Sequence, residues 1–376
     1  MKMKKQRILS ILLSIVCFLF LLPMEQLPVQ AASTVLEPYV LETADEKNQM
    51  KAKIYSFTSD GEALIPIKIP KNGSVVMKMY VENYGFINMQ LYPSAATDTL
   101  PSAWSCQCTG DLGNRGTTMR YFEKGTYYIR FPANKYEISL VLYANRSQTV
   151  KSGNLISGYA DYHHPVYYKY KAPKDGYITI ETTSVIDTFF LPDVTLCNSK
   201  KKAITDSKRN HESSDKIVYA VKKNTTYQIK VTSNDPYGSQ YYQFRMTYTE
   251  RSENSGSKKS NAVSIKLGKS TSGLVFAEEK TSTEDWYKIK ITKKQNVKLY
   301  YSGSITSGSM LFDVYDAKGK QYANYSVVAN VGTKDEDSLD KKGSISQLPK
   351  GTYYIRVKKT RKTSSGIYTI RLEKEK

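Results

Sequence analysis

The chain has few of the residues that enzymes use for catalysis or for binding transition metals. It contains three histidines and four cysteines in 376 residues. His163 and His164 are adjacent, and His211 lies in a polar stretch beside Glu212. None of the three belongs to a His-Glu-x-x-His, Gly-x-Ser-x-Gly or paired Cys and His arrangement, which would supply a metal ligand set or an activated nucleophile. The sequence therefore predicts a protein that is not an enzyme.

An unrecognised active site is the alternative, and residues 92–118 are where we would expect it. The alternation found elsewhere gives way there to Ser, Thr, Gly and Asp, which predicts a long loop, and long loops are often functional. The stretch contains Cys106 and Cys108, while Cys197 is left without a sequence neighbour. In an extended strand the first two would have Cα atoms about 6.5 to 7 Å apart, too far for an unstrained disulfide, whereas in a turn they could bridge.

Only one long apolar run is present, and it lies at the N-terminus. Residues 1–7 are basic, residues 8–22 are almost wholly apolar, and Val29-Gln30-Ala31 supplies the small residues that a signal peptidase recognises. The run is short for a membrane span of about 20 residues. We therefore expect residues 1–31 to be a cleaved signal peptide. This predicts a secreted, extracellular protein without a transmembrane segment, either released or held non-covalently at the cell wall.

Acidic residues are outnumbered, since 35 Asp and Glu stand against 55 Lys and Arg and leave a net charge of +20. A charge of this size favours anionic partners. The expected partners are an extracellular polysaccharide, a cell-wall polymer or a matrix protein. Nucleic acid would suit the charge, but export from the cell argues against it. Nothing in the sequence indicates an oligomeric state.

A six-residue repeat is the clearest positive feature of the chain. Gly-Thr-Tyr-Tyr-Ile-Arg occurs at residues 125–130 and again at 351–356, and a weaker copy with Tyr-Gln-Ile-Lys ends at residue 230. Each copy alternates residue by residue, as a strand with one buried face does. The alternation predicts that the first tyrosine and the isoleucine of each copy point into a core, and that the intervening residues face outward.

Repeats and turns divide the chain after the signal peptide into three modules. Gly153 and Gly158 are five residues apart, and Gly268 and Gly273 repeat this spacing before the third hexapeptide. Short alternating runs separated by turn residues, with no helical periodicity, indicate an all-β fold of antiparallel β-sandwiches of jelly-roll type. The predicted modules are residues 32–145, which are divergent, 150–250 and 262–376, with a linker at 251–261.

The third module resembles a known family. Asp285-Trp286-Tyr287, the stretch from Lys350 to Val357 and Gly366-Ile367-Tyr368-Thr369 are together similar to the bacterial pre-peptidase C-terminal domain. This is a jelly-roll-like β-sandwich appended to secreted proteases and related to the collagen-binding domains of clostridial collagenases. The resemblance is clearest over residues 262–372 and weaker over the other two modules, so it implies three tandem copies. In the family the domain does no chemistry, and some members bind matrix protein.

The resemblance also implies a candidate calcium site. The related collagen-binding domains bind calcium through acidic residues that lead into the first strand, where this chain has Glu278, Glu279, Glu284 and Asp285. Hard oxygen ligands at this density could hold Ca²⁺. A solvated acidic turn is the alternative, because no loop of the EF-hand type imposes ligand spacing. No other cofactor is expected.

The outer face of the repeated strand is the candidate binding surface. Tyr128 with Arg130, and Tyr354 with Arg356, are expected on the solvent side of equivalent strands, where rings stack on sugars or side chains and arginine donates hydrogen bonds. Tyr168 is expected to face solvent in the second module. The alternative is that these tyrosines cover neighbouring strands and pack between modules.

Two functions follow from these observations. The first is a secreted, non-catalytic bacterial protein that binds an extracellular polymer, polysaccharide or matrix protein, through its tandem modules. The second is a structural protein of the cell envelope that its basic charge holds to anionic wall polymers.

Overall fold

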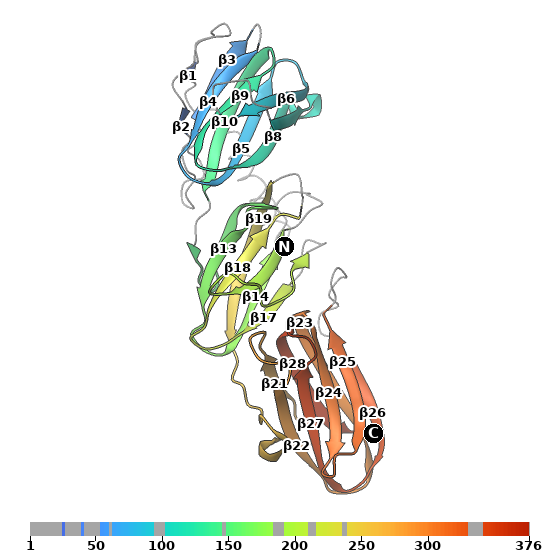
Figure 1. Ribbon diagram of the computed structural model, residues 1–376. Coiled ribbons are helices and arrows are strands. Elements are labelled where there is room, and N and C mark those ends of the chain that lie inside the picture. The colour runs from blue at the N-terminus through green and yellow to red at the C-terminus, as the bar shows by residue number, and fades with distance from the viewer. Residues whose placement is uncertain are drawn as a thin grey trace. The chain divides into compact units, whose positions relative to one another are not determined.

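The computed structural model of the chain is built from β-strands (Figure 1). Within the residues that it describes there are two short 3₁₀ helices and no α-helix, and no helix is long and apolar enough to cross a membrane. The strands form six sheets, which pair into about three sandwiches, so the predicted all-β fold is confirmed. The described residues are 25–26, 39–40, 53–59, 62–93, 102–144, 148–182, 192–209, 216–234, 239–329 and 341–375.

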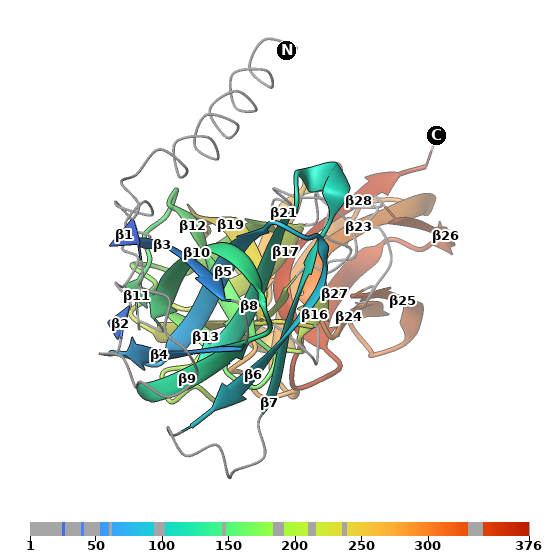
Figure 2. The same ribbon diagram turned by 90° about the horizontal axis from the view of Figure 1, so that it is seen from above.

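The first module consists of two five-stranded sheets around one core. Their strand orders are β1-β3-β10-β5-β8 and β2-β4-β9-β6-β7, and Figure 2 shows β4, β9 and β6 of the second sheet side by side. β1 falls within the predicted signal peptide. The elements are β1 Glu25–Gln26, β2 Tyr39–Val40, β3 Lys53–Ser59, β4 Ala63–Ile69, β5 Gly73–Val81, β6 Gly85–Tyr92, β7 Ser102–Cys108, η1 Gly110–Leu112, β8 Arg115–Phe122, β9 Gly125–Phe131 and β10 Asn134–Ala144.

Much of the stretch predicted as a long loop, residues 92–118, is strand. β7 alternates strictly, with Trp104, Cys106 and Cys108 in the core and polar residues such as Gln107 on the outer face. The prediction was wrong because β7 is an edge strand, whose outer side chains can all be small or polar. Both cysteines are free thiols, and burial raises the pKa of Cys106 to about 12.

The chain divides into two compact units, of which the first is Met1–Asn145 with Tyr237–Ser239. The second unit holds two further sandwiches. The earlier one has the sheets β11-β13-β18-β15-β16 and β12-β19-β14-β17. Its strands are β11 Gln148–Thr149, β12 Leu155–Asp161, β13 Val166–Lys171, β14 Gly176–Thr182, β15 Asp193–Asn198, β16 Lys208–Arg209, β17 Lys216–Val221, β18 Thr226–Thr232 and β19 Ser239–Glu250.

The later sandwich of this unit is the third module. Its sheets have the orders β20-β22-β27-β24-β25 and β21-β28-β23-β26 around a second large core. The elements are η2 Lys259–Asn261, β20 Val263–Ser264, β21 Thr271–Val275, β22 Glu284–Ile291, β23 Gln295–Ser307, β24 Ser309–Asp316, β25 Gln321–Val328, β26 Lys341–Leu348, β27 Gly351–Lys359 and β28 Ser365–Lys374.

The repeated hexapeptide forms the central strand of one sheet in every module. β9, β18 and β27 each stand third in a five-stranded order, and the isoleucine of each copy is fully buried, so the predicted inner face is confirmed. The first tyrosine also fixes the turn before the strand. The Tyr127 hydroxyl donates to the Glu123 carbonyl at 3.1 Å, and the Tyr353 hydroxyl donates to the Pro349 carbonyl at 2.9 Å. The repeat therefore specifies both a buried face and a turn.

In the third module, the second glycine of the repeated spacing, Gly273, makes room for a buried pair of tyrosines. The hydroxyl groups of Tyr287 on β22 and Tyr368 on β28 lie 2.7 Å apart and join the two sheets through the core. A Cβ atom at Gly273 would lie 2.2 Å from the Tyr368 hydroxyl, closer than any side chain could tolerate. Glycine at this position is thus a condition for the tyrosine pair.

The second module has the same arrangement. The Tyr168 and Tyr242 hydroxyl groups contact each other in its core, and a Cβ atom at Gly158 would lie 2.7 Å from the Tyr242 hydroxyl. Tyr168 is only 2% exposed, so the prediction that it faces solvent is wrong. Successive residues of a strand face opposite sides, and on β13 it is Tyr167 that takes the outer face, opposite Lys230.

A carboxyl group is buried beside the tyrosine pair of the third module. Asp285 accepts hydrogen bonds from the Tyr368 hydroxyl and from the Ser255 Oγ, both at 2.8 Å. Burial and the nearby Glu253 carboxylate raise the pKa of Asp285 to about 7. The folded state therefore holds a proton that the unfolded chain, with an ordinary aspartate pKa of 3.8, releases at lower pH.

The close approach at Gly273 gives a first prediction. Gly273→Ala should lower the free energy of unfolding of the third module by about 1 to 3 kcal/mol, because the added methyl group overlaps the Tyr368 hydroxyl. Calorimetry of the purified chain measures the change. Gly110→Ala is the matched control, since the nearest atom to its Cβ would be 3.9 Å away, on Tyr84. Equal effects of the two substitutions would contradict the account.

The Asp285 carboxyl gives a second prediction. Because its pKa is raised in the folded state, its contribution to stability is present below about pH 4 and is lost as the pH rises toward 7, by an amount on the order of a few kcal/mol. Asp285→Asn keeps an acceptor for Tyr368 but cannot ionise. The melting temperature of the wild type should therefore fall relative to the variant between pH 4.5 and 8, and parallel curves would refute the assignment.

Candidate functional site

The outer face of the third module is centred on an arginine that its own neighbours saturate. Arg356 on β27 donates from Nε and Nη2 to Asp313 Oδ2 at 2.9 and 2.6 Å, from Nη1 to Glu284 Oε1 at 2.9 Å, and from Nη2 to the Tyr315 hydroxyl at 2.7 Å. Asp313 is fully buried. Burial lowers the pKa of Arg356, but Asp313, Tyr315 and Glu284 together outweigh it and the pKa is raised. This guanidinium holds the sheet together and has little capacity left for a ligand.

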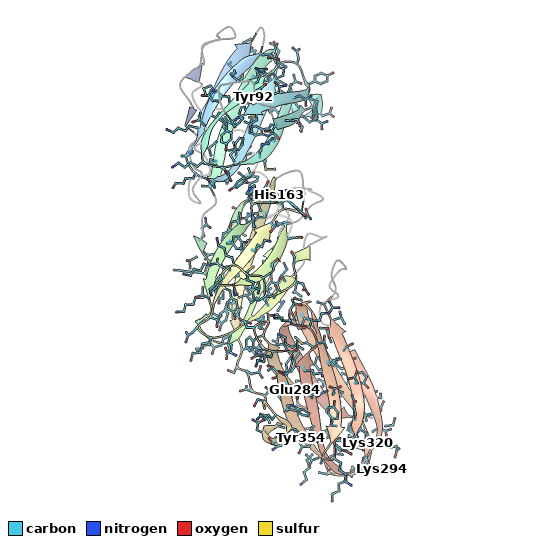
Figure 3. All side chains as sticks on the ribbon, viewed as in Figure 1. Tyr92, His163, Glu284, Lys294, Lys320 and Tyr354 are labelled. Atoms are coloured by element: carbon cyan, nitrogen blue, oxygen red, sulfur yellow. The ribbon has the colours of Figure 1, made fainter. Side chains whose placement is uncertain are left out.

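Residues of the predicted linker, 251–261, close the same face. Gly256 pairs with Trp286 at the edge of β22 through backbone hydrogen bonds of 3.0 and 2.7 Å. The Lys259 Nζ lies 4.8 Å from the centre of the Tyr354 ring and donates to two carbonyl groups of the turn after β24, both at 3.0 Å. Figure 3 labels Glu284 and Tyr354 on this module. Tyr354 and Arg356 are therefore contacted by the protein's own chain.

The equivalent arginine of the first module has weaker partners. Arg130 on β9 donates from Nη1 to Gln90 Oε1 at 3.4 Å, and its Nε lies 3.5 Å from Glu62 Oε2. The Glu62 side chain is 65% exposed, and an ion pair of this kind contributes about 0 to 1 kcal/mol. The guanidinium also lies over the Tyr92 ring, labelled in Figure 3, at 5.0 Å from its centre. This arginine retains donors for another group.

A row of exposed side chains on β6 adjoins Arg130. Phe86, Asn88 and Gln90 alternate with core residues and are all exposed, Phe86 to 61%. Tyr128 lies on the same face, since it pairs with Tyr92 at the end of this row. The row thus combines an aromatic ring and two amide groups with a cation, which are the groups that bind sugar rings, hydroxyl groups and acidic groups.

The second module does not offer such a face. Its hexapeptide copy has Gln228 in place of Tyr128, and Gln228 is 7% exposed while the Cys197 beside it is fully buried. The Lys201 ammonium lies 4.6 Å from the centre of the Tyr167 ring on the same face. The exposed row of the first module therefore has no counterpart here among the described residues.

The four carboxylates predicted as calcium ligands are not brought together. Glu284 and Asp285 are adjacent on β22 and so face opposite sides of the sheet. In the described part of the chain, no three His, Cys, Asp or Glu side chains are grouped as a metal site requires. The carboxylates accept instead from protein donors: Glu278 from the Tyr227 hydroxyl, Glu279 from Lys222, Glu284 from Arg356 and Trp286, and Asp285 from Tyr368 and Ser255.

A buried lysine lies near two of these acidic residues, Glu278 and Glu279. Lys359 is 2% exposed, and its Nζ donates to the carbonyl groups of Phe276, Ala277 and Glu279 at 2.8, 3.0 and 2.9 Å. Burial lowers its pKa, and Glu279 and Glu278 oppose this. The ammonium thereby occupies the centre of an oxygen-lined turn, the position that a metal ion would need.

The histidines show one pairing. His164 Nδ1 lies 2.9 Å from Asp161 Oδ1, and the same oxygen accepts from the His163 backbone N–H at 2.9 Å. His163, labelled in Figure 3, stacks edge-on against Tyr162 at the turn after β12. His211 lies outside the described residues. The pair orders this turn.

Tyr128 and Arg130 were predicted from the sequence as binding residues, whereas Phe86, Asn88 and Gln90 were not. The signal was available, since alternation along residues 86–91 places these three on one side of a strand. What the sequence could not supply was the register that sets Gln90 directly opposite Arg130.

Comparison with known proteins identifies part of the third module. The family model described as bacterial pre-peptidase C-terminal domain matches residues 283–359. No curated protein sequence matches the chain. The resemblance of the first two modules to this family remains a prediction.

Several solved structures overlap the chain weakly. The pre-peptidase C-terminal domain of a collagenase from Bacillus anthracis is 14% identical over 33% of this chain and 100% of its own, with a TM-score of 0.22. The tandem CBM22 domains of Paenibacillus barcinonensis Xyn10C are 7% identical over 55% of this chain and 82% of their own, with a TM-score of 0.20. The secreted serine protease VesC from Vibrio cholerae is 8% identical over 81% of this chain and 74% of its own, with a TM-score of 0.22. Scores this low support no conclusion about function.

The family match and the fold together support one statement of identity. Pre-peptidase C-terminal domains occur in secreted bacterial proteins. Residues 283–359 of this chain form a bacterial pre-peptidase C-terminal domain within the third of about three β-sandwich modules.

Proposed function

We propose that this protein is a secreted, non-catalytic bacterial protein that binds an extracellular polymer through the outer face of its first module. The observation that carries the proposal is the row Phe86, Asn88 and Gln90 on β6, exposed side by side with Arg130. The family match in the third module and the predicted signal peptide support export. This face presents a ring, two amides and a cation, so binding is the chemistry that it supports best.

The contacts within each module indicate which module binds the ligand. In the third module the equivalent face is contacted by Lys259 and its arginine is saturated by Asp313. We therefore assign it a structural role and place the ligand on the divergent first module. This narrows the predicted ligand-binding residues from Tyr128, Arg130, Tyr354 and Arg356 to the first two.

The alternative is a structural envelope protein held by its net charge of +20 alone. Charge of this kind acts through a screened, non-specific attraction that salt removes. It would depend equally on every exposed cation, whereas a built face depends on particular side chains. The two functions are therefore separated by substitutions of matched charge.

Retention of the purified chain without residues 1–31 on cell walls, polysaccharides and collagen tests the proposal. Phe86→Ala and Arg130→Ala should each weaken retention about tenfold at moderate salt, because each removes a contact worth about 1 to 2 kcal/mol. Lys294→Ala, an exposed cation of the third module, is the control of equal charge and should leave retention unchanged.

Two outcomes would contradict the proposal. Absence of retention on any of the polymers would exclude polymer binding. Equal weakening by Arg130→Ala and Lys294→Ala, with full release by salt, would favour the envelope protein held by charge.

A further inference from the structure

The first and third modules place equivalent strands side by side but differ in the residue that lies opposite the arginine. Gln90 on β6 lies directly opposite Arg130 on β9, and Asp313 on β24 lies directly opposite Arg356 on β27. The next pairs along, Tyr92 with Tyr128 and Tyr315 with Tyr354, are the same two tyrosines. The register therefore compares an arginine facing an amide with an arginine facing a carboxylate at equivalent positions of the two sheets.

The carboxylate in the third module neutralises its arginine. Asp313 is fully buried, and both of its oxygens are used, Oδ2 by Arg356 and Oδ1 by Gln321 at 2.9 Å and by Asn324. A guanidinium that donates from two nitrogens to one oxygen of a buried carboxylate forms charge-assisted hydrogen bonds, which are stronger than neutral ones. This arginine has its counter-ion inside the protein.

The amide in the first module leaves the charge of Arg130 largely uncompensated. Gln90 Oε1 accepts a 2.7 Å bond from the Tyr92 hydroxyl and only a 3.4 Å contact from Arg130. Glu62 is the single carboxylate paired with Arg130 in the described contacts, at 3.5 Å and largely in water. The Arg130 side chain is 28% exposed, so an anion from outside can reach it.

The groups around Arg130 fit a sugar polymer better than a protein surface. Asn88 and Gln90 on β6 and Gln107 on β7 are exposed amides on one face, which can donate to and accept from hydroxyl groups. Phe86, opposite Gln107, offers a ring for stacking. Lys68 on β4 adds an exposed cation to this face. A protein partner would instead be expected to use a large, well-packed apolar centre.

We infer that the outer face of the first module recognises an acidic polysaccharide, whose oxyanion takes at Arg130 the position that the Asp313 carboxylate has at Arg356. This inference rests on the proposed function and adds the chemical class of the ligand to it. Guanidinium matches carboxylate and phosphate oxygens equally well through paired N–H donors. The anion is therefore a carboxylate or a phosphate carried by the polymer, and Arg130 is the residue that selects for it.

The test is to give Arg130 an internal counter-ion. Gln90→Asp places a carboxylate opposite Arg130, as in the third module, and should weaken retention on polygalacturonate about tenfold or more. Asn154→Asp is the matched control, because it makes the same change of charge at an exposed position of the second module, outside the proposed face. It should weaken retention much less. Arg130→Lys should also weaken retention, since it keeps the charge and loses the paired donors.

Three immobilised polymers separate the outcomes: polygalacturonate for carboxylate, phosphorylated dextran for phosphate and plain dextran as a neutral chain. Retention on either acidic polymer that Gln90→Asp weakens and Asn154→Asp spares supports the inference and names the anion. Retention on dextran or collagen that Gln90→Asp leaves unchanged overturns the inference while the proposed function stands. Equal loss with both aspartate variants also overturns it, and absence of retention on any polymer overturns both.

Discussion

The core constrains one strand in each module, and most of the molecule's surface chemistry follows from that strand. β9, β18 and β27 lie at the centre of a five-stranded sheet, so the inner side chains must fill the sandwich. Because successive side chains of a strand alternate between faces, a sequence that fixes the inner Tyr-x-Ile-x-apolar pattern also fixes which residues face outward. Tyr128 and Arg130, Gln228 and Lys230, and Tyr354 and Arg356 are outer residues for this reason.

What the outer residues do depends on their neighbours across the sheet. Arg356 faces a buried carboxylate and has the linker residues against its face, so it stabilises the third module. Arg130 faces an amide beside an exposed row on β6, so its positive charge is largely uncompensated. The same hexapeptide therefore serves as a structural element in the module that matches the family model and as the candidate binding element in the divergent one. Divergence from the family pattern is where the proposed function lies.

Local periodicity was enough to predict the fold class, because a buried strand must show it wherever it occurs. It predicted the inner face of the hexapeptide and failed where a strand lies at an edge, as in β7, whose outer residues are polar and small. Local periodicity could not predict contacts between residues that are far apart in the sequence. Glycine is required at residue 273 because Tyr368 packs against it. The outer face of the third module is held together by Asp313 opposite Arg356. Tyr168 was predicted on the wrong face because the alternation along β13 puts Tyr167 outside and Tyr168 in the core.

The central claim is that Arg130 is available to a ligand while Arg356 is not. The two side chains differ little in exposure, 28% against 19%, so the hydrogen bonds must decide. Modification of the folded chain with an arginine-selective dicarbonyl, followed by mass spectrometry of the peptides, measures this directly. The account predicts that Arg130 is modified early and Arg356 is protected until the protein unfolds. Equal rates, or faster modification of Arg356, would contradict it.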